Sequence, residues 1–228
     1  MTNGASGSVS FNVFIDSGRS QVWGGSFGST TAPIYPVALN TSGNGSVASS
    51  PIYGRIYGGQ STALTGAYSS DIAVTTYAST TPATCGGPTT VSAFLVTATY
   101  SPTCTLATST LDFGNITTLA AAVDGQTNLT VTCSNGGAYS VSLDGGLTGA
   151  TDPTQRKMTR ASHQMSYGLY RDGGRTLPWG STSGAGGDTL GSTGTGSGQI
   201  LPVYGRISIQ PTPPPGTYTD TIVVTVTN

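Results

Sequence analysis

A chain of 228 residues is long enough for one large domain or two small ones. Only 7% of its residues are charged, 8 basic against 9 acidic, and the net charge is −1 at pH 7. This balance excludes the polybasic surface by which proteins bind nucleic acid or anionic lipid. No apolar stretch approaches the roughly 18 residues that span a bilayer, so we expect no membrane-spanning segment.

Segments from the first third of the chain recur near its end. Residues 14–19 (FIDSGR) match residues 170–175 (YRDGGR). Further matches in the same order pair Trp23 with Trp179, residues 51–56 with 202–207, and residues 66–68 with 216–218. The repeat predicts that residues 10–77 are the second half of a unit that residues 100–228 contain in full. The first half of that unit has no counterpart in front of residue 10.

Each copy of the repeat carries an Asp and an Arg close to its tryptophan. These are Asp16 and Arg19 in the first copy, and Asp172 and Arg175 in the second. Both a charged binding site and a turn-capping or salt-bridging role fit these residue types. A specialised binding site is expected only once, so the recurrence favours the structural role.

Residues 89–100 (TTVSAFLVTATY) are expected to form a strand directly before Cys104. Val91, Ala93 and Leu95 would share one face of it, and Phe94, Val96 and Ala98 the other. Two interpretations stay open: the segment is the first strand of the second domain, or it completes the half-domain in front of it. We place the domain boundary at this strand, with a truncated domain at 1–88 and a complete one at 89–228.

Alternating patterns continue through the second domain. Residues 129–133 (LTVTC) and 139–143 (YSVSL) place apolar side chains at every second position, with Thr or Ser between them. The last expected strand alternates in the same way at Ile222, Val224 and Val226. Strands that bury one face each imply two sheets packed on each other, so the sequence predicts an all-β sandwich.

The cysteines and the single histidine provide no recognisable catalytic or metal site. Cys85, Cys104 and Cys133 form no CxxC pair, and His163 has neither a nucleophile motif nor a flanking carboxylate pattern. We expect no enzyme, no metal and no cofactor. If Cys104 and Cys133 pair, the disulfide joins two strands. Such a bond persists in an oxidising compartment. Cys85 then has a partner outside the chain or is free.

The order of the motifs in the second domain resembles the spore coat protein U domain of archaic chaperone–usher pilus subunits. The matching segments are Cys104, 111–114 (LDFG), 131–136 (VTCSNG), 139–146 (YSVSLDGG), 156–158 (RKM), 167–170 (YGLY), Trp179, 203–206 (VYGR) and 213–218 (PPPGTY). The resemblance implies a tandem of immunoglobulin-like antiparallel β-sandwiches, each lacking one strand. That strand is supplied by another subunit through donor-strand exchange.

The resemblance also implies a function. It predicts a structural or adhesive subunit of an extracellular pilus, secreted through the periplasm to the cell surface, with two domains like a tip adhesin. The implied partners are other pilus subunits, a periplasmic chaperone and an outer-membrane usher. The donor or groove candidates are Val91, Ala93, Leu95, Ile222, Val224 and Val226, and the surface-binding candidates are Phe27 and Tyr35. Two alternatives stay open: a structural protein of a spore or cell-surface coat, and a secreted carbohydrate-binding module.

Overall fold

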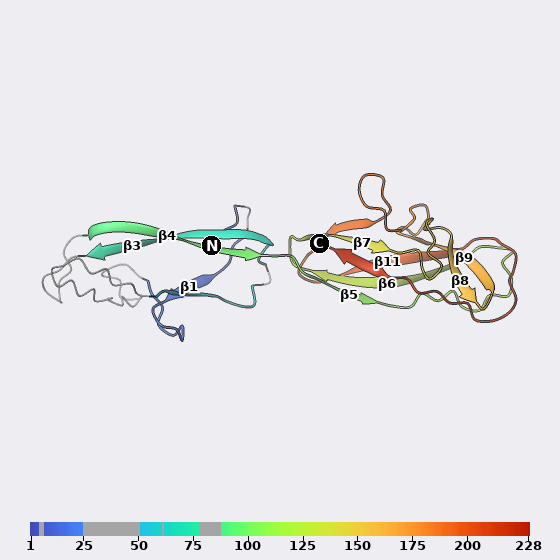
Figure 1. Ribbon diagram of the computed structural model, residues 1–228, viewed down its shortest axis with the longest axis horizontal. Coiled ribbons are helices and arrows are strands. Elements are labelled where there is room, and N and C mark those ends of the chain that lie inside the picture. The colour runs from blue at the N-terminus through green and yellow to red at the C-terminus, as the bar shows by residue number, and fades with distance from the viewer. Residues whose placement is uncertain (5–6, 25–50, 61, 78–87) are drawn as a thin grey trace. The chain divides into compact units, whose positions relative to one another are not determined.

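The computed structural model describes residues 1–4, 7–24, 51–60, 62–77 and 88–228 (Figure 1). The chain divides into two compact units, Met1–Tyr100 and Ser101–Asn228. Throughout the described ranges the regular elements are strands, and the strands pair in antiparallel fashion. The predicted all-β class is therefore confirmed.

The C-terminal unit contains two sheets. Its strands are β5 (Cys104–Thr108), β6 (Val123–Cys133), β7 (Ala138–Leu143), β8 (Arg156–Arg160), β9 (His163–Tyr170), β10 (Leu190–Thr193), β11 (Gly198–Ile207) and β12 (Val224–Thr227). One sheet has the order β5-β6-β11-β9-β8 and the other the order β10-β7-β12. Strands β6, β7 and β11 alternate between buried and more exposed positions, as strands that cover a core on one face must do.

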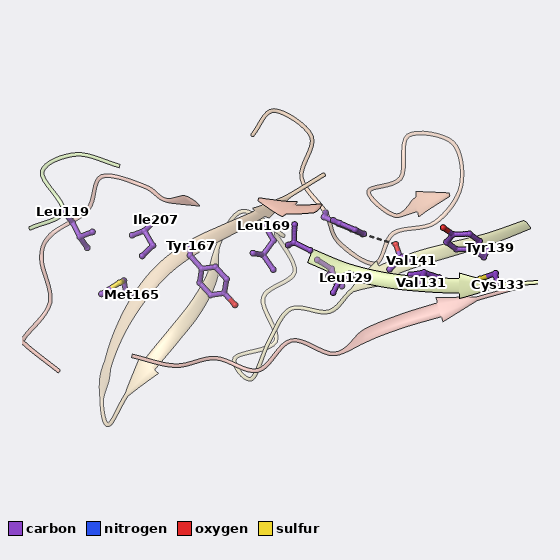
Figure 2. Packing of buried hydrophobic residues seen from close by; sticks show 13 residues of the cluster. Leu119, Leu129, Val131, Cys133, Tyr139, Val141, Met165, Tyr167, Leu169 and Ile207 are labelled. Atoms are coloured by element: carbon purple, nitrogen blue, oxygen red, sulfur yellow. Dashed lines mark hydrogen bonds between the residues drawn. The ribbon is translucent and has the colours of Figure 1, made fainter. Parts of the chain in front are cut away.

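Side chains from both sheets meet in one core (Figure 2). Its buried members are Leu119, Leu129, Val131, Cys133, Tyr139, Val141, Leu143, Met165, Tyr167, Leu169, Trp179, Val203 and Ile207. Trp179 is fully buried, and its indole Nε1 donates a hydrogen bond of 3.0 Å to the carbonyl of Val141. A buried tryptophan that satisfies its N–H in this way joins the loop after β9 to strand β7 of the other sheet.

A disulfide joins Cys104 to Cys133, which face each other across β5 and β6. Cys133 is buried in the core, whereas Cys104 is partly exposed at the start of the edge strand. The bond therefore fixes the edge strand to the centre of its sheet. Cys85 lies outside the described residues.

The N-terminal unit consists of two strand pairs. Strand β1 (Phe11–Phe14) pairs with β2 (Tyr53–Ile56), and β3 (Gly66–Tyr77) pairs with β4 (Pro88–Tyr100). Because β4 bonds to β3 along its whole length, it belongs to this unit. The division of the chain falls after Tyr100, whereas the sequence analysis placed it before residue 89.

The repeat seen in the sequence extends to strand register. Phe14 faces Tyr53 across β1 and β2, and Tyr170 faces Tyr204 across β9 and β11. Residues 14–19 and 170–175 occupy equivalent positions in the two copies, so the N-terminal unit contains counterparts of β9 and of the end of β11.

The repeated Asp and Arg residues build the same turn in both units. Arg19 and Arg175 have φ values of 55° and 58°, and each donates its Nε to a strand carbonyl at 3.0 Å. Asp16 and Asp172 accept backbone N–H groups on the far side of the turn. These backbone hydrogen bonds lower the pKa of both carboxyls, as expected where N–H donors stabilise the charged form.

The disulfide gives a first prediction. The double substitution Cys104→Ser and Cys133→Ser opens a loop between residues 29 positions apart. The chain-entropy model predicts a loss of about 3.6 kcal/mol in the free energy of unfolding. Urea unfolding followed by tryptophan fluorescence measures it, with dithiothreitol-reduced wild type as the control. A double variant with the midpoint of the oxidised wild type contradicts the prediction.

Candidate functional site

The last strand of the chain has one paired edge and one open edge. Strand β12 pairs with β7, and just before it Val223 exchanges bonds with Asp144: its carbonyl accepts the Asp144 N–H at 3.1 Å, and its N–H donates to Oδ1 at 3.0 Å. Neighbouring residues of a strand direct their backbone groups to opposite edges. Those of Ile222, Val224 and Val226 therefore face away from β7. In the part of the chain that the structure describes, no strand pairs with β12 on that side.

The side chains along this open edge are apolar and incompletely covered. Ile222, Val224 and Val226 are half-buried and pack against the core, whereas Val223 is 57% exposed on the other face. An unpaired edge above partly covered apolar side chains is a site at which a further strand can add.

A buried arginine holds the chain next to this edge. Arg156 is only 1% exposed and lies at the start of β8. Its guanidinium donates to the carbonyls of Asp144 at 2.7 Å, Pro153 at 2.7 Å, Trp179 at 2.8 Å and Leu143 at 3.2 Å. A single side chain thus connects the end of β7 with two loops.

Asp220 fixes the segment that leads into β12. Its carboxylate accepts the hydroxyl of Tyr167 at 2.7 Å and the backbone N–H of Leu147 at 2.8 Å. Burial, reinforced by the hydrogen bond to Asp220, raises the pKa of Tyr167 far above its usual range. The tyrosine therefore remains a neutral donor at any physiological pH.

Strand β3 is the counterpart of residues 216–227 in the N-terminal unit. Tyr68 near its start donates its hydroxyl to the carbonyl of Leu64. Tyr218 does the same to the carbonyl of Pro214 at 2.9 Å. In both units, the hydroxyl thus closes the loop that leads into the segment.

Backbone bonding identifies the two edges of β3. Ser69 exchanges two backbone hydrogen bonds with Thr2, just as Thr219 does with Thr159. Val223 lies four residues after Thr219, so both direct their backbone groups to the same edge of the segment, where Thr219 bonds to Thr159 and Val223 to Asp144. The opposite edge of β3 carries β4.

Strand β4 therefore occupies the edge that corresponds to the open edge of β12. The facing pairs are Tyr68 with Ala98, Ser70 with Val96, and Ile72 with Phe94. The two units thus present the same segment in two situations, with and without a neighbouring strand.

Comparison with known proteins identifies the family of this chain. The model of the Spore Coat Protein U domain matches residues 1–75 and 90–225. The chain belongs to the Spore Coat Protein U domain family. A curated relative, Protein U of Myxococcus xanthus, is 35% identical over 130 residues, which make up 52% of this chain and 71% of that protein.

A solved structure has a similar fold. It is the pre-assembly complex of the chaperone CsuC with the tip adhesion subunit CsuE, from the archaic chaperone-usher Csu pili of Acinetobacter baumannii. The TM-score is 0.54 at 21% identity, and the match covers 99% of this chain and 79% of that chain. The antiparallel immunoglobulin-like class expected from the sequence agrees with this likeness, which at such low identity concerns the fold alone.

The structure places the predicted site residues of this Spore Coat Protein U chain on two different strands. Ile222, Val224 and Val226 lie at the open edge, half-buried as described above. Ala93 and Leu95 lie on β4 and are exposed, Leu95 to 61%. The half-buried face of β4 is instead formed by Phe94, Val96 and Ala98. Val91 of β4 pairs with Thr75 of β3, but its side chain lies outside the described part of the structure. Phe27 and Tyr35 also lie outside the described residues.

Sequence analysis did not single out the polar cluster of Asp144, Arg156, Tyr167 and Asp220. Asp144, Arg156 and Tyr167 lie within segments that carry the family resemblance, and this was the signal that could have pointed to them. Within the described ranges, no group of three or more His, Cys, Asp or Glu residues is placed to hold a metal ion. The same ranges contain no helix long and apolar enough to cross a membrane.

The buried arginine gives a second prediction. Arg156→Met keeps the apolar volume but removes the donor to four carbonyls, of which that of Pro153 still accepts the N–H of Leu169 at 3.3 Å. We expect the free energy of unfolding to fall by roughly 3–5 kcal/mol, because each buried unsatisfied group costs about 1–3 kcal/mol. The control is Arg206→Met, which removes an exposed ion pair to Asp124 and should hardly move the urea midpoint. Equal midpoints for the two variants would contradict this role of Arg156.

Proposed function

We propose that this chain is a subunit of an extracellular pilus assembled by the chaperone–usher route. In this proposal the C-terminal unit accepts a strand of another subunit along the open edge of β12. The observation that carries it is the contrast between the two units: β4 fills on β3 the edge that β12 leaves open. Family membership and the fold of the Csu complex are consistent with it.

Strand addition satisfies the physical requirements of this edge. An incoming strand supplies partners for the backbone groups of Ile222, Val224 and Val226. Its inward-facing side chains cover the half-buried apolar residues beneath. The N-terminal unit shows how long such a paired segment can be, because β4 pairs with β3 from Pro88 to Tyr100.

The proposed partners follow from the same edge. A periplasmic chaperone would cover it before assembly, an outer-membrane usher would export the subunit, and another pilus subunit would replace the chaperone. The Cys104–Cys133 disulfide fits this route, because disulfides persist in the periplasm and outside the cell. The protein is accordingly periplasmic in transit and exposed at the cell surface.

We further propose a position at the tip of the fibre. Strand β4 is already bound to β3, so the chain uses that strand internally while its C-terminal unit keeps an acceptor edge. A subunit with this arrangement can receive a strand and end a fibre. Phe27 and Tyr35 are the residues that we propose contact the surface to which the fibre tip binds.

A coat protein is the second candidate, favoured by the description of the family as the Spore Coat Protein U domain. The two functions differ in their dependence on export. Loss of an usher should remove a pilus subunit from the cell surface and leave it in the periplasm. A coat component would still reach its layer.

Strand addition gives a third prediction. A synthetic peptide of residues 88–100 added to the intact chain should bind saturably and slow amide exchange at Ile222, Val224 and Val226. Val226→Pro removes an N–H that faces the open edge while leaving the bonds to β7, so affinity should fall at least about tenfold. Val226→Ala is the matched control, because it shortens the side chain but keeps the N–H.

A peptide carrying Phe94→Asp tests whether the inward face matters, and it should bind more weakly. Unchanged binding by Val226→Pro would refute strand addition at this edge. Exchange protection confined to residues 66–77 would mean that the peptide replaces β4 instead, which also refutes it.

A further inference from the structure

The N-terminal unit contains an apolar cavity of about 260 Å³, lined in part by the start of β3 and the end of β4. Its apolar and aromatic lining includes Val9, Ile56, Tyr57, Ala63, Tyr68 and Tyr100. Ile56 is 50% exposed, and Tyr57 and Tyr100 are each 40% exposed. Three large apolar side chains around one cavity thus remain in contact with solvent, which marks an interaction site.

The repeat identifies the equivalent place in the C-terminal unit. Gln60 bonds through its amide to both backbone groups of Ser10, and Gln210 makes the same two bonds to Ser166. This correspondence, together with the strand register, places Val9 at the position of Met165 and Ile56 at that of Ile207. The two sites therefore have the same framework.

In the C-terminal unit, this place is filled by Leu119. Its side chain is fully buried and belongs to the core cluster with Met165 and Ile207, beside which Figure 2 shows it. Ile207 is completely buried, in contrast to the half-exposed Ile56. The difference between the two isoleucines matches the presence and absence of the leucine.

The backbone of Leu119 is also held. Its N–H donates to Oγ1 of Thr212 at 3.1 Å, and its carbonyl accepts the N–H of Gln210 at 3.4 Å. Gln60 occupies the position of Gln210 in the N-terminal unit. The framework that anchors the leucine segment is thus present around the cavity.

We propose that this cavity is a socket for a leucine-class side chain on a polypeptide segment that resembles residues 104–143 of the C-terminal unit. The apolar lining selects an aliphatic side chain, and Gln60 offers its N–H to the carbonyl of that residue. The occupant is a further polypeptide segment with this pattern, and not the Leu119 segment of a second copy. Removing that segment from its own unit would expose a fully buried leucine inside the loop closed by the Cys104–Cys133 disulfide.

A fusion protein tests the proposal at high effective concentration of the occupant. A second copy of residues 101–143 is joined to Met1 of the intact chain through a flexible linker. We expect amide exchange at residues 56–60 to slow at least about tenfold relative to the unfused chain. A matched fusion with Leu119→Asp in the added copy should show no such protection, because a carboxylate cannot be buried in an apolar socket without a large cost.

Substitutions on the receiving side complete the test. Ile56→Asp in the fusion should abolish the protection, whereas Ile52→Asp, at a residue that is also exposed but does not line the cavity, should preserve it. Val226→Pro should leave the protection intact, so the result is independent of strand addition at β12. Unchanged exchange at 56–60, or equal protection with Leu119→Asp, would overturn the proposal.

Discussion

The organisation of this chain depends on a backbone constraint in one segment, residues 216–227. Because N–H and C=O groups of successive strand residues point to opposite edges, a segment bonded on one edge leaves a complete second row of partners unsatisfied. Thr219 and Val223 bond on one side, to Thr159 and to the end of β7. The counterpart in the N-terminal unit is a strand of 12 residues with a partner, whereas β12 has 4. A neighbour on the second edge therefore extends the regular strand.

A segment without that neighbour needs other means of staying in place, and polar groups provide them in the C-terminal unit. The carboxylate of Asp220 accepts the N–H of Leu147, and that of Asp144 accepts the N–H of Val223 just before β12. Arg156 donates to the carbonyls of Leu143 and Asp144 and so connects the end of β7 to the adjoining loops. The hydrogen bonds of this cluster replace the ladder that β4 provides in the N-terminal unit. They hold the acceptor edge in shape without covering it, which is what binding of a further strand requires.

Sequence patterns predicted more of the architecture than of the site. The repeat around residues 14–19 and 170–175 predicted equivalent turns, because the same short-range hydrogen bonds recur wherever that motif occurs. The inward face of β4 was not predictable, since both faces carry apolar residues and alternation alone does not distinguish Leu95 from Phe94. The role of Arg156 was hidden for a different reason: its acceptors lie in separate loops, and carbonyl groups have no sequence signature.

The scarcity of charge bears on how an open edge is tolerated. Soluble proteins commonly protect edge strands with charged side chains, proline or bulges. Between Val224 and Thr227 the chain has only valine and threonine, and charged residues make up 7% of the whole sequence. An edge of this composition pairs readily with any extended chain, so it is useful for assembly and hazardous before it. The proposed chaperone follows from this constraint: a cover must occupy the edge until the intended strand replaces it.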